Sequence, residues 1–447
     1  MEFDLFSDAI RLDVARRALV RLAKTLKAPF SVRLWDGSMV PLGQTVEANS
    51  FISINGPKVI STVLRHPSLE TLARLYASGK IDIHSDDFIS FLDILRQKES
   101  KKRLRTLKKT PFLMDALIFL LSPSEKIKTE HDLSQSKAGS SESQRNNRDY
   151  IQFHYDLSND FYALFLDPQM QYSCAYFSDK NDTLEEAQKN KLEMICRKLC
   201  LKAGEKMLDI GSGWGGLICY AAKNYGVTAH GVTLSEKQYQ YTLRKIEQAG
   251  LEKLVTVELK DYMQVEGSYD KIASIGMFEH IGLANIPAYF NKINSLLPDR
   301  GLLLNHAITR RAKGSKKKFY KTVTSMRLSQ KFIFPGAALD HLGHSVESME
   351  LQGFEVRDVE SWREHYALTT ALWCRRLIAR REEGIRYVGM ERYRLWVGYL
   401  GAVSLGFIDG SLNICQTVAV KRATSGLSGL PLTRSDWYAK KTTIPLL

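Results

Sequence analysis

The feature that most constrains the fold is a glycine loop between an apolar strand and a helix. The stretch MLDIGSGWGGL, residues 207 to 217, runs into Gly211, Gly213 and Gly215, and a helical pattern follows. Glycines permit a tight turn and let a ligand approach the backbone closely. Strand signals then alternate with helical stretches, in KMLDIG, VTAHGVT, LVTVEL, YDKIASIG and GLLLNHAI. This order predicts βαβ units and a parallel, Rossmann-like α/β sheet.

The form of the loop indicates which ligand it binds. A dinucleotide site usually reads G-x-G-x-x-G and has an acidic residue at the end of the next strand. Here the loop reads G-x-G-x-G, Asp209 precedes it, and the second strand ends near Thr233 and Gln238. Asp261 and Tyr262 follow the third strand, where adenine contact and plain packing are equally consistent with the sequence. The pattern resembles the S-adenosylmethionine (SAM) loop of class I methyltransferases.

Length and charge limit the remaining possibilities. The chain has 447 residues, enough for two domains, and carries a net charge of +14 with a pI near 9.3. An excess of basic residues calls for an anionic partner, either nucleic acid or an anionic membrane. No signal peptide or transmembrane span is expected, and six cysteines without a C-x-x-C pair suit a reducing cytoplasm.

Composition divides the chain into four parts. An N-terminal domain is expected over 1–122, with a hairpin in FSVRLWDGSMV and a serine-capped helix in SLETLARLYASGKIDI. Residues 123–147 hold almost no apolar residues and are expected to be a flexible linker. The catalytic domain should span 148–420, with a C-terminal tail over 421–447. The runs FEVRDVES and ICQTVAV could add edge strands.

A basic run precedes the linker. Eight lysines and arginines lie between residues 96 and 109. They could form a solvated helix face, or they could contact lipid head groups, since a basic cluster beside an amphipathic stretch is attracted to anionic lipid.

A set of further motifs makes the resemblance specific. These motifs are HYDLSNDFYALFLDPQMQYSCAYF, GVTLSEKQ, SIGMFEHIG, HAIT and KFIFPGAALD. Together with the glycine loop they resemble the cyclopropane-fatty-acyl-phospholipid synthase family, which includes the mycolic acid cyclopropane synthases. The resemblance covers about 148–420 and reaches the N-terminal domain through HPSLETLARLYASGKIDIHSDDF. It implies a seven-stranded methyltransferase sheet with a helical lid insert, and a smaller α+β N-terminal domain for lipid binding or dimerisation.

The resemblance also implies a reaction. In the family, the SAM methyl group is added to a cis double bond of a phospholipid acyl chain. The resulting carbocation then loses a proton to a bound bicarbonate, and a cyclopropane ring closes. The bicarbonate pocket matches this chain at Cys174, Glu279, His306 and Tyr366. The family's LLHTI is LLNHAI here, and this departure puts the hydrogen bonding around His306 in question.

The resemblance gives Cys174 a pocket role rather than a nucleophilic one. Its backbone would help to bind bicarbonate, although each of the four residues could instead serve only the core. Tyr172 and Ser173 match family positions that contact SAM. No metal is expected, and the candidate cofactor residues are Tyr172, Ser173, Asp209, Gly211, Gly213, Gly215, Thr233, Leu234, Gln238, Asp261 and Tyr262.

An insert follows the fifth strand. Six of the nine residues from 310 to 318 are basic, and the apolar run KFIFPGAAL comes after them. The insert could be a solvated face beside a core segment. Alternatively, it forms a lid that holds phosphate, with Phe332, Ile333 and Phe334 guiding the acyl chain as substrate-binding residues.

The expected protein is a cytoplasmic, peripheral-membrane methyltransferase, with a membrane phospholipid as substrate and a homodimer possible. Three alternatives stay open: a related enzyme with a methyl-branched or unsaturated product, an RNA methyltransferase, and a non-catalytic lipid-binding homologue. The sequence shows no RNA-binding module, so no nucleic-acid partner is expected.

Overall fold

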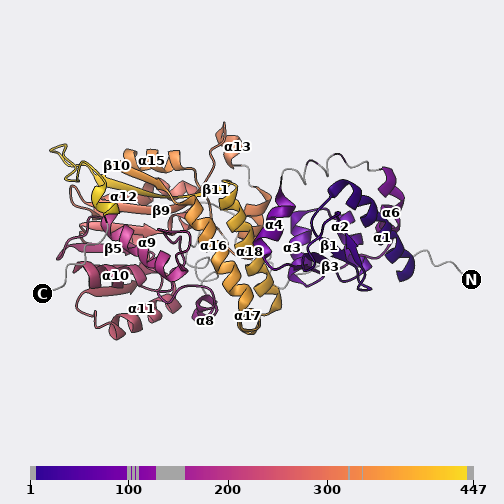
Figure 1. Ribbon diagram of the computed structural model, residues 1–447. Coiled ribbons are helices and arrows are strands. Elements are labelled where there is room, and N and C mark those ends of the chain that lie inside the picture. Colours follow the sequence, from indigo (N-terminus) through magenta and orange to yellow (C-terminus); the bar gives the residue numbers. More distant parts are fainter. Residues whose placement is uncertain are drawn as a thin grey trace, which may run out of the picture. The chain divides into compact units, whose positions relative to one another are not determined.

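The structure is a computed structural model, and it describes residues 7–97, 102, 106, 110–126, 157–320, 323–334 and 336–439. The chain forms two compact units, each assembled from separated segments (Figure 1). The first unit contains the described residues up to 126, with 323–333 and 373–405. The second unit contains 157–320, 334–372 and 406–439. Most of the basic run at 96–109 and nearly all of the linker lie outside the described residues.

The first unit is built on a four-stranded mixed sheet. Its order is β2-β1-β3-β4, in which β1 pairs with β3 in parallel and the other neighbours are antiparallel. The predicted hairpin around Asp36 is confirmed, because Ser31–Arg33 pairs with Met39–Pro41. The predicted helix also forms, and the Ser68 side chain accepts a hydrogen bond from the Thr71 amide at its start. The elements are α1 (Asp8–Leu26), β1 (Ser31–Arg33), β2 (Met39–Pro41), β3 (Phe51–Ile54), α2 (Pro57–Arg65), α3 (Leu69–Ala77), β4 (Ile81–His84), α4 (Phe88–Arg96), α6 (Thr110–Leu121), α14 (Thr324–Phe332) and α17 (Arg381–Val388).

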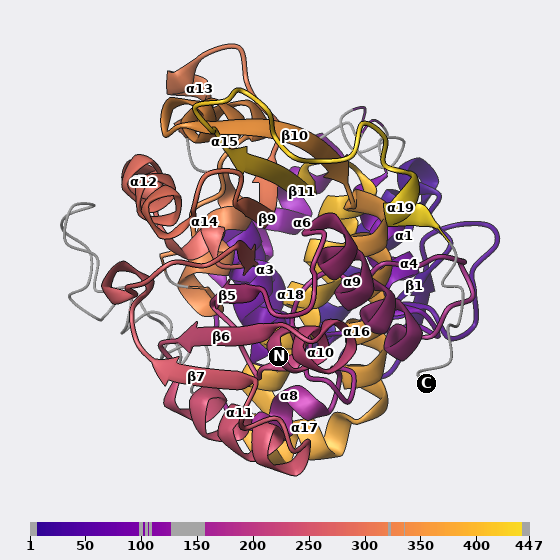
Figure 2. The same ribbon diagram turned by 90° about the vertical axis from the view of Figure 1, so that its left-hand side faces the viewer.

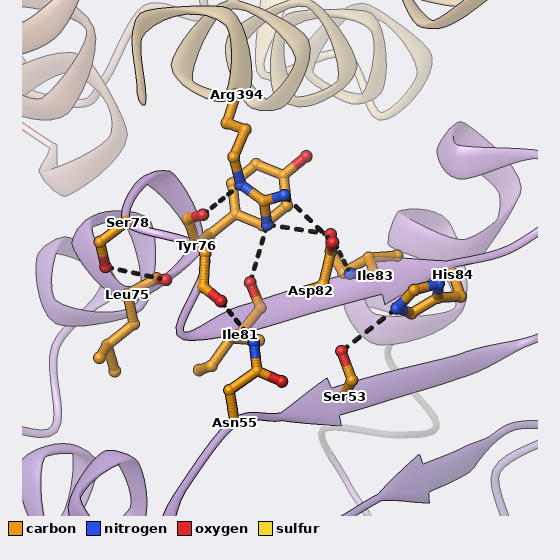
Figure 3. A network of polar contacts seen from close by, with 11 residues as sticks. Ser53, Asn55, Leu75, Tyr76, Ser78, Ile81, Asp82, Ile83, His84 and Arg394 are labelled. Atoms are coloured by element: carbon orange, nitrogen blue, oxygen red, sulfur yellow. Dashed lines mark hydrogen bonds and ion pairs between the residues drawn. The ribbon is translucent and has the colours of Figure 1, made fainter. Parts of the chain in front are cut away.

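A buried arginine joins a late helix to this N-terminal sheet. Arg394, on α18 (Met390–Ile408), donates two hydrogen bonds to the Asp82 carboxylate, at 2.9 and 3.1 Å (Figure 3). It also donates to the carbonyl oxygens of Tyr76 and Ile81, and its guanidinium lies 4.3 Å from the centroid of the Tyr76 ring. A bidentate guanidinium–carboxylate pair fixes both groups in orientation. This network explains why residues 373–405 belong to the first unit.

The second unit has the predicted Rossmann-like sheet. Seven strands lie in the order β10-β11-β9-β8-β5-β6-β7, and the five strands from β5 to β9 run parallel. The strands are β5 (Lys206–Ile210), β6 (Thr228–Thr233), β7 (Val255–Leu259), β8 (Lys271–Ile275), β9 (Leu302–Arg310), β10 (Phe354–Ser361) and β11 (Leu412–Lys421). Both late apolar runs form strands. Of these two strands, β10 lies at an edge of the sheet. β11 does not, because it pairs antiparallel with β9 as well as with β10.

Helices cover both faces of this sheet. Figure 2 shows α12 on one side and α9 and α10 on the other. The α12 side contains a continuous apolar core that includes Ile272 on β8, Phe290 on α12 and Met349 on α15. No helix in the described part of the chain is long and apolar enough to cross a membrane. The helical elements are α8 (Asn159–Ala163), α9 (Leu184–Lys198), α10 (Gly216–Tyr225), α11 (Glu236–Gln248), η3 (Tyr262–Gln264), η4 (Phe278–His280), η5 (Leu283–Asn285), α12 (Ile286–Leu296), α13 (Lys316–Tyr320), α15 (Leu342–Leu351) and α19 (Ser435–Tyr438), while α16 (Arg363–Ala379) and α18 contribute residues to both units.

Candidate active site

A pocket opens in the second unit at the carboxyl ends of β5, β6 and β8. It encloses about 900 Å³, solvent at its mouth included. Open α/β sheets bind ligands at this edge. Nine of the eleven predicted cofactor residues line it: Tyr172, Ser173, Asp209, Gly211, Gly213, Thr233, Leu234, Gln238 and Tyr262.

The other two residues support the wall from behind. Gly215 begins α10 with φ +74°, and a Cβ atom there would lie 2.5 Å from Cγ2 of Thr242 on α11. Only glycine permits this close approach of two helices. Asp261 accepts a hydrogen bond from the Met263 amide at 2.9 Å and so caps η3, which holds Tyr262 in place.

Polar groups on the β6 side are already paired with each other. The Thr233 hydroxyl donates to Oε1 of Gln238 at 2.8 Å and accepts from the Ser235 amide at 3.2 Å. The two pocket residues therefore form one rigid polar corner, and a ligand would meet preformed geometry rather than loose side chains.

An aromatic wall closes another side of the pocket. The ring of Tyr172 stacks on that of Phe334, with centroids 6.5 Å apart and planes at 8°. Phe334 also contacts the ring of His280, which lines the pocket, at 5.8 Å. Burial lowers the pKa of His280 to about 4, so this ring is neutral near pH 7. Aromatic faces attract a sulfonium cation.

Of the three predicted substrate residues, only Phe334 belongs to the second unit. Phe332 and Ile333 lie in the first unit, where the Arg74 guanidinium sits 5.4 Å from the centroid of the Phe332 ring. In the basic part of the insert, Arg310 lies 3.8 Å from the centroid of the Phe319 ring.

Lys191 is a pocket residue that the sequence reasoning missed. Its side chain is 1 % exposed and donates hydrogen bonds to Oε1 of Gln171 and, at 3.0 Å, to Oγ of Ser173. Asp209 lines the same pocket, and its Oδ1 has no hydrogen-bond partner within the described chain. Burial raises the pKa of Asp209 to about 7, although Lys191 opposes the shift. A signal was present, because Lys191 lies on the buried face of α9, which is mostly apolar and includes Ala187 and Ile195.

Next to the pocket lies a group of buried polar residues, here called the chamber. Its first member is Glu279 on η4, whose Oε1 accepts a hydrogen bond from the Ile308 amide at 2.5 Å. Oε2 is buried and has no hydrogen-bond partner among the described residues. Burial raises the pKa of Glu279 to about 7. The carboxyl group is therefore poised between its charged and neutral forms at neutral pH.

The second member of the chamber is His306, two residues before Ile308 on β9. It is fully buried, and Nδ1 lies 3.1 Å from Nε2 of Gln416 on the paired strand β11. With the Gln416 amide assigned in this orientation, it donates to Nδ1, and the imidazole proton then resides on Nε2. In the described structure Nε2 has no partner. Burial lowers the pKa of His306 well below its usual value, so the ring is a neutral donor. Gln416, which the sequence analysis did not single out, therefore supplies the hydrogen bonding that the LLNHAI departure had put in question.

Cys174 and Tyr366 connect to the chamber through Trp362. The Trp362 ring meets the His306 ring edge to face at 5.3 Å. The Cys174 thiol lies 3.7 Å from the Trp362 carbonyl oxygen, and the Tyr366 amide donates to the same oxygen at 3.0 Å. Burial raises the pKa of the Cys174 thiol well above its usual value, so the thiol is not activated as a nucleophile. The Tyr366 ring packs on Phe407 at 4.6 Å.

The sheet and this pocket define a class I SAM-dependent methyltransferase. A family model described as "Mycolic acid cyclopropane synthetase" matches residues 142–417. The chain is 33 % identical to a "Probable fatty acid methyltransferase" of Pseudomonas putida, over 93 % of this chain and 98 % of the relative. It is 38 % identical to the "Cyclopropane-fatty-acyl-phospholipid synthase" of Escherichia coli K12, over 61 % of this chain and 68 % of that protein.

A solved structure gives the same result. The mycolic acid cyclopropane synthase CmaA1, complexed with S-adenosylhomocysteine (SAH) and CTAB, is 33 % identical with a TM-score of 0.59. The similarity covers 62 % of this chain and all of that one. The chain therefore belongs to the mycolic acid cyclopropane synthetase family, and it is a SAM-dependent methyltransferase.

Proposed function

We propose that the protein transfers a methylene group from SAM to a cis double bond in the acyl chain of a membrane phospholipid, with bicarbonate as the base. The observation that carries this proposal is the pair of buried polar atoms without partners in the described structure, Oε2 of Glu279 and Nε2 of His306. Buried polar atoms nearly always have partners, and each orphan requires an explanation. Glu279 accepts a hydrogen bond from the amide of Ile308, two residues after His306 on β9, so we propose that one small polyatomic ligand meets both atoms.

The chamber residues fit bicarbonate. Neutral His306 would donate from Nε2, and Glu279 could donate when protonated or accept the bicarbonate hydroxyl when charged. The Cys174 backbone and Tyr366 are the other proposed contacts. When bound, bicarbonate supplies a base that can take a proton from the added methyl group. Several hydrogen bonds are needed, because an unpaired anion is costly to desolvate.

The pocket residues fit SAM. Tyr262 is buried against Tyr289 and offers a face for adenine, while the Thr233–Gln238 corner suits ribose hydroxyls. Asp209 would take the amino group, and Tyr172 would face the sulfonium. SAM supplies the electrophilic methyl group. The chain's own contribution is orientation and the exclusion of water, which would trap a carbocation as an alcohol.

Mass spectrometry of lipids from cells that express the chain tests this reaction. The expected product is an acyl chain heavier by one CH2 that no longer reacts as an alkene. Cells that express Glu279→Gln at the same level should lack it. A host rich in cis-unsaturated phospholipid that shows no such product contradicts the proposal.

A second candidate product is a methyl-branched chain. It is favoured by the Pseudomonas putida relative, which is named a fatty acid methyltransferase and matches over nearly its whole length. In that case the same CH2 gain would accompany a branched chain that keeps one carbon–carbon double bond, because the carbocation loses a proton without closing a ring. Fragmentation that locates the added carbon distinguishes a branch from a ring.

We also propose that the protein contacts the cytoplasmic face of a membrane, and one surface of the first unit supports contact with lipid. Helix α6 packs on α1 and α2 with its inner side, where Phe119 is buried. Its outer side is also apolar, since Leu113, Met114, Leu117, Leu120 and Leu121 are 40–82 % exposed. A helix on the solvent-exposed surface of a protein normally turns polar residues outward. In the sequence this helix directly follows the basic run, a combination suited to an anionic lipid surface.

Co-sedimentation with vesicles tests this surface. The double variant Leu117→Ser/Leu121→Ser should bind anionic vesicles at least tenfold more weakly, with SAM affinity unchanged. Unchanged vesicle binding rejects α6 as the lipid contact. A shift to smaller mass in light scattering, with vesicle binding intact, would instead assign the face to a second copy of the chain.

A further inference from the structure

We propose that Lys191 is a positioning residue for the cofactor: together with Gln188 it fixes the segment Gln171–Ser173 in the conformation that receives SAM. Neither the sequence motifs nor the comparisons point to this lysine. The proposal rests on hydrogen bonds, burial and the place of the side chain in the pocket.

Helix α9 holds the segment through four hydrogen bonds. Gln188 donates through Nε2 to the carbonyl oxygens of Gln171 and Ser173, at 3.3 and 2.9 Å. Lys191 lies one turn further along α9 and donates to the side chains of the same two residues. Because 188 and 191 are three residues apart, they share one face of the helix. The intervening residue, Tyr172, is thereby held with its ring at the aromatic wall.

Gln171 is in turn fitted closely against the glycine loop. A Cβ atom at Gly216 would lie 1.9 Å from Nε2 of Gln171, so that side chain fills the space above the start of α10. Lys191 holds the other end of the amide, at Oε1. The lysine therefore links the segment that carries Tyr172 to the loop that carries Gly211 and Gly213.

Burying a lysine to hold a loop has a high free-energy cost. Removing an ammonium group from water costs several kcal/mol unless partners compensate. The nearby groups that titrate are Asp167 before the segment, Asp209 on β5, the Cys174 thiol and His306 on β9. Burial lowers the pKa of Lys191 to about 8, and the two carboxyl groups oppose this shift. Retention of the charge is explained if the cation keeps Asp209 ionised for the cofactor's amino group.

Calorimetric titration with SAM and with SAH tests the role. Lys191→Met should raise the Kd of SAM at least tenfold, and it should raise KM for SAM more than it lowers kcat. Lys191→Gln, which keeps a donor but not the charge, should fall between the two proteins. In the wild type, SAM affinity should weaken as pH rises through about 8 because Lys191 loses its charge. That step should be smaller in Lys191→Gln.

Lys198 provides a matched control on the same helix. Its side chain is equally buried, but it pairs with Glu360 and does not line the pocket. Lys198→Met should lower stability and leave the Kd of SAM unchanged. An unchanged Kd in folded Lys191→Met overturns the proposal. If that variant does not fold, an unchanged Kd and an unchanged pH step in Lys191→Gln overturn it.

Discussion

The pocket and the chamber are built from adjacent residues of the chain at two places, yet their polar groups are paired to different extents. In the pocket, Thr233 and Gln238 are bonded to each other and to backbone, and the exception is Oδ1 of Asp209, which has no partner among the described residues. In the chamber, Glu279 and His306 each have one buried polar atom without a partner in the described chain. Ser173 lines the pocket while Cys174 is fully buried, and His280 lines it while Glu279 is buried.

From this difference we expect the pocket to bind SAM and the chamber to take part in the reaction. Preformed hydrogen bonds and close helix packing give a rigid binding surface at little reorganisation cost. Unpaired buried groups with shifted pKa values lower stability and are characteristic of catalytic sites. A substitution in the chamber should therefore change turnover or stability without changing SAM affinity.

The largest expected effect on stability comes from Glu279. In wild-type protein the folded Glu279 carboxyl stays protonated up to about pH 7, whereas the unfolded chain ionises near its ordinary value. The free energy of unfolding should therefore fall as pH rises between about 4.5 and 7, by roughly 3 kcal/mol from this residue. Glu279→Gln should lack this contribution.

Urea unfolding in bicarbonate-free buffer measures this pH dependence of the free energy of unfolding. The stability of Glu279→Gln relative to wild type should increase from pH 4.5 to 7 and then level off. Cys174→Ala, which leaves the carboxyl group in place, should keep the wild-type slope. A constant difference between Glu279→Gln and wild type at all pH values contradicts a buried, weakly acidic Glu279.

The next effect is on turnover, at Gln416. Gln416→Leu removes the donor that fixes the proton of His306 on Nε2. We expect kcat to fall about tenfold to a hundredfold, as when the orienting partner of a functional histidine is lost. The Kd of SAM should stay within a factor of about two, because Gln416 lies outside the pocket. Thr417→Val, on the neighbouring residue of β11, should have near wild-type turnover; an equal loss there would show a general packing defect.

The smallest effect is expected at Cys174. Its thiol is buried, and its pKa is raised, so it cannot serve as a thiolate near pH 7. Cys174→Ala should keep activity within about threefold and lose about 1 kcal/mol of stability. Steady-state rates measured with saturating SAM test the predicted activity. Loss of all activity in this variant, with the fold intact, would restore the nucleophile interpretation.

The sequence predicted the parallel sheet, and nine of its eleven candidate cofactor residues line one pocket, for a physical reason. Strand and helix periodicity, with glycines at the end of β5, are local signals, and the carboxyl edge of a parallel sheet brings the strand ends together. The sequence did not reveal the position of β11, because an apolar run does not indicate which strands it pairs with. It also missed Lys191 and Gln416, whose roles depend on contacts with residues 171 and 306 that no local pattern encodes.

The sequence also showed no sign that the insert is divided between the two compact units. The run KFIFPGAAL is one apolar stretch in sequence, but Phe332 and Phe334 belong to different compact units. Composition cannot show this, since both residues are equally suited to a core.

The most direct test of the account compares Glu279→Gln with wild type in SAM affinity and in turnover, on the same preparations. SAM affinity is measured by calorimetry, and SAH release is measured with vesicles of cis-unsaturated phospholipid. The account predicts a Kd within a factor of about two and a turnover lower by about 10²- to 10⁴-fold, the range of a lost acid–base group. A wild-type turnover in the variant, or a parallel loss of SAM binding, would contradict the separation of pocket and chamber.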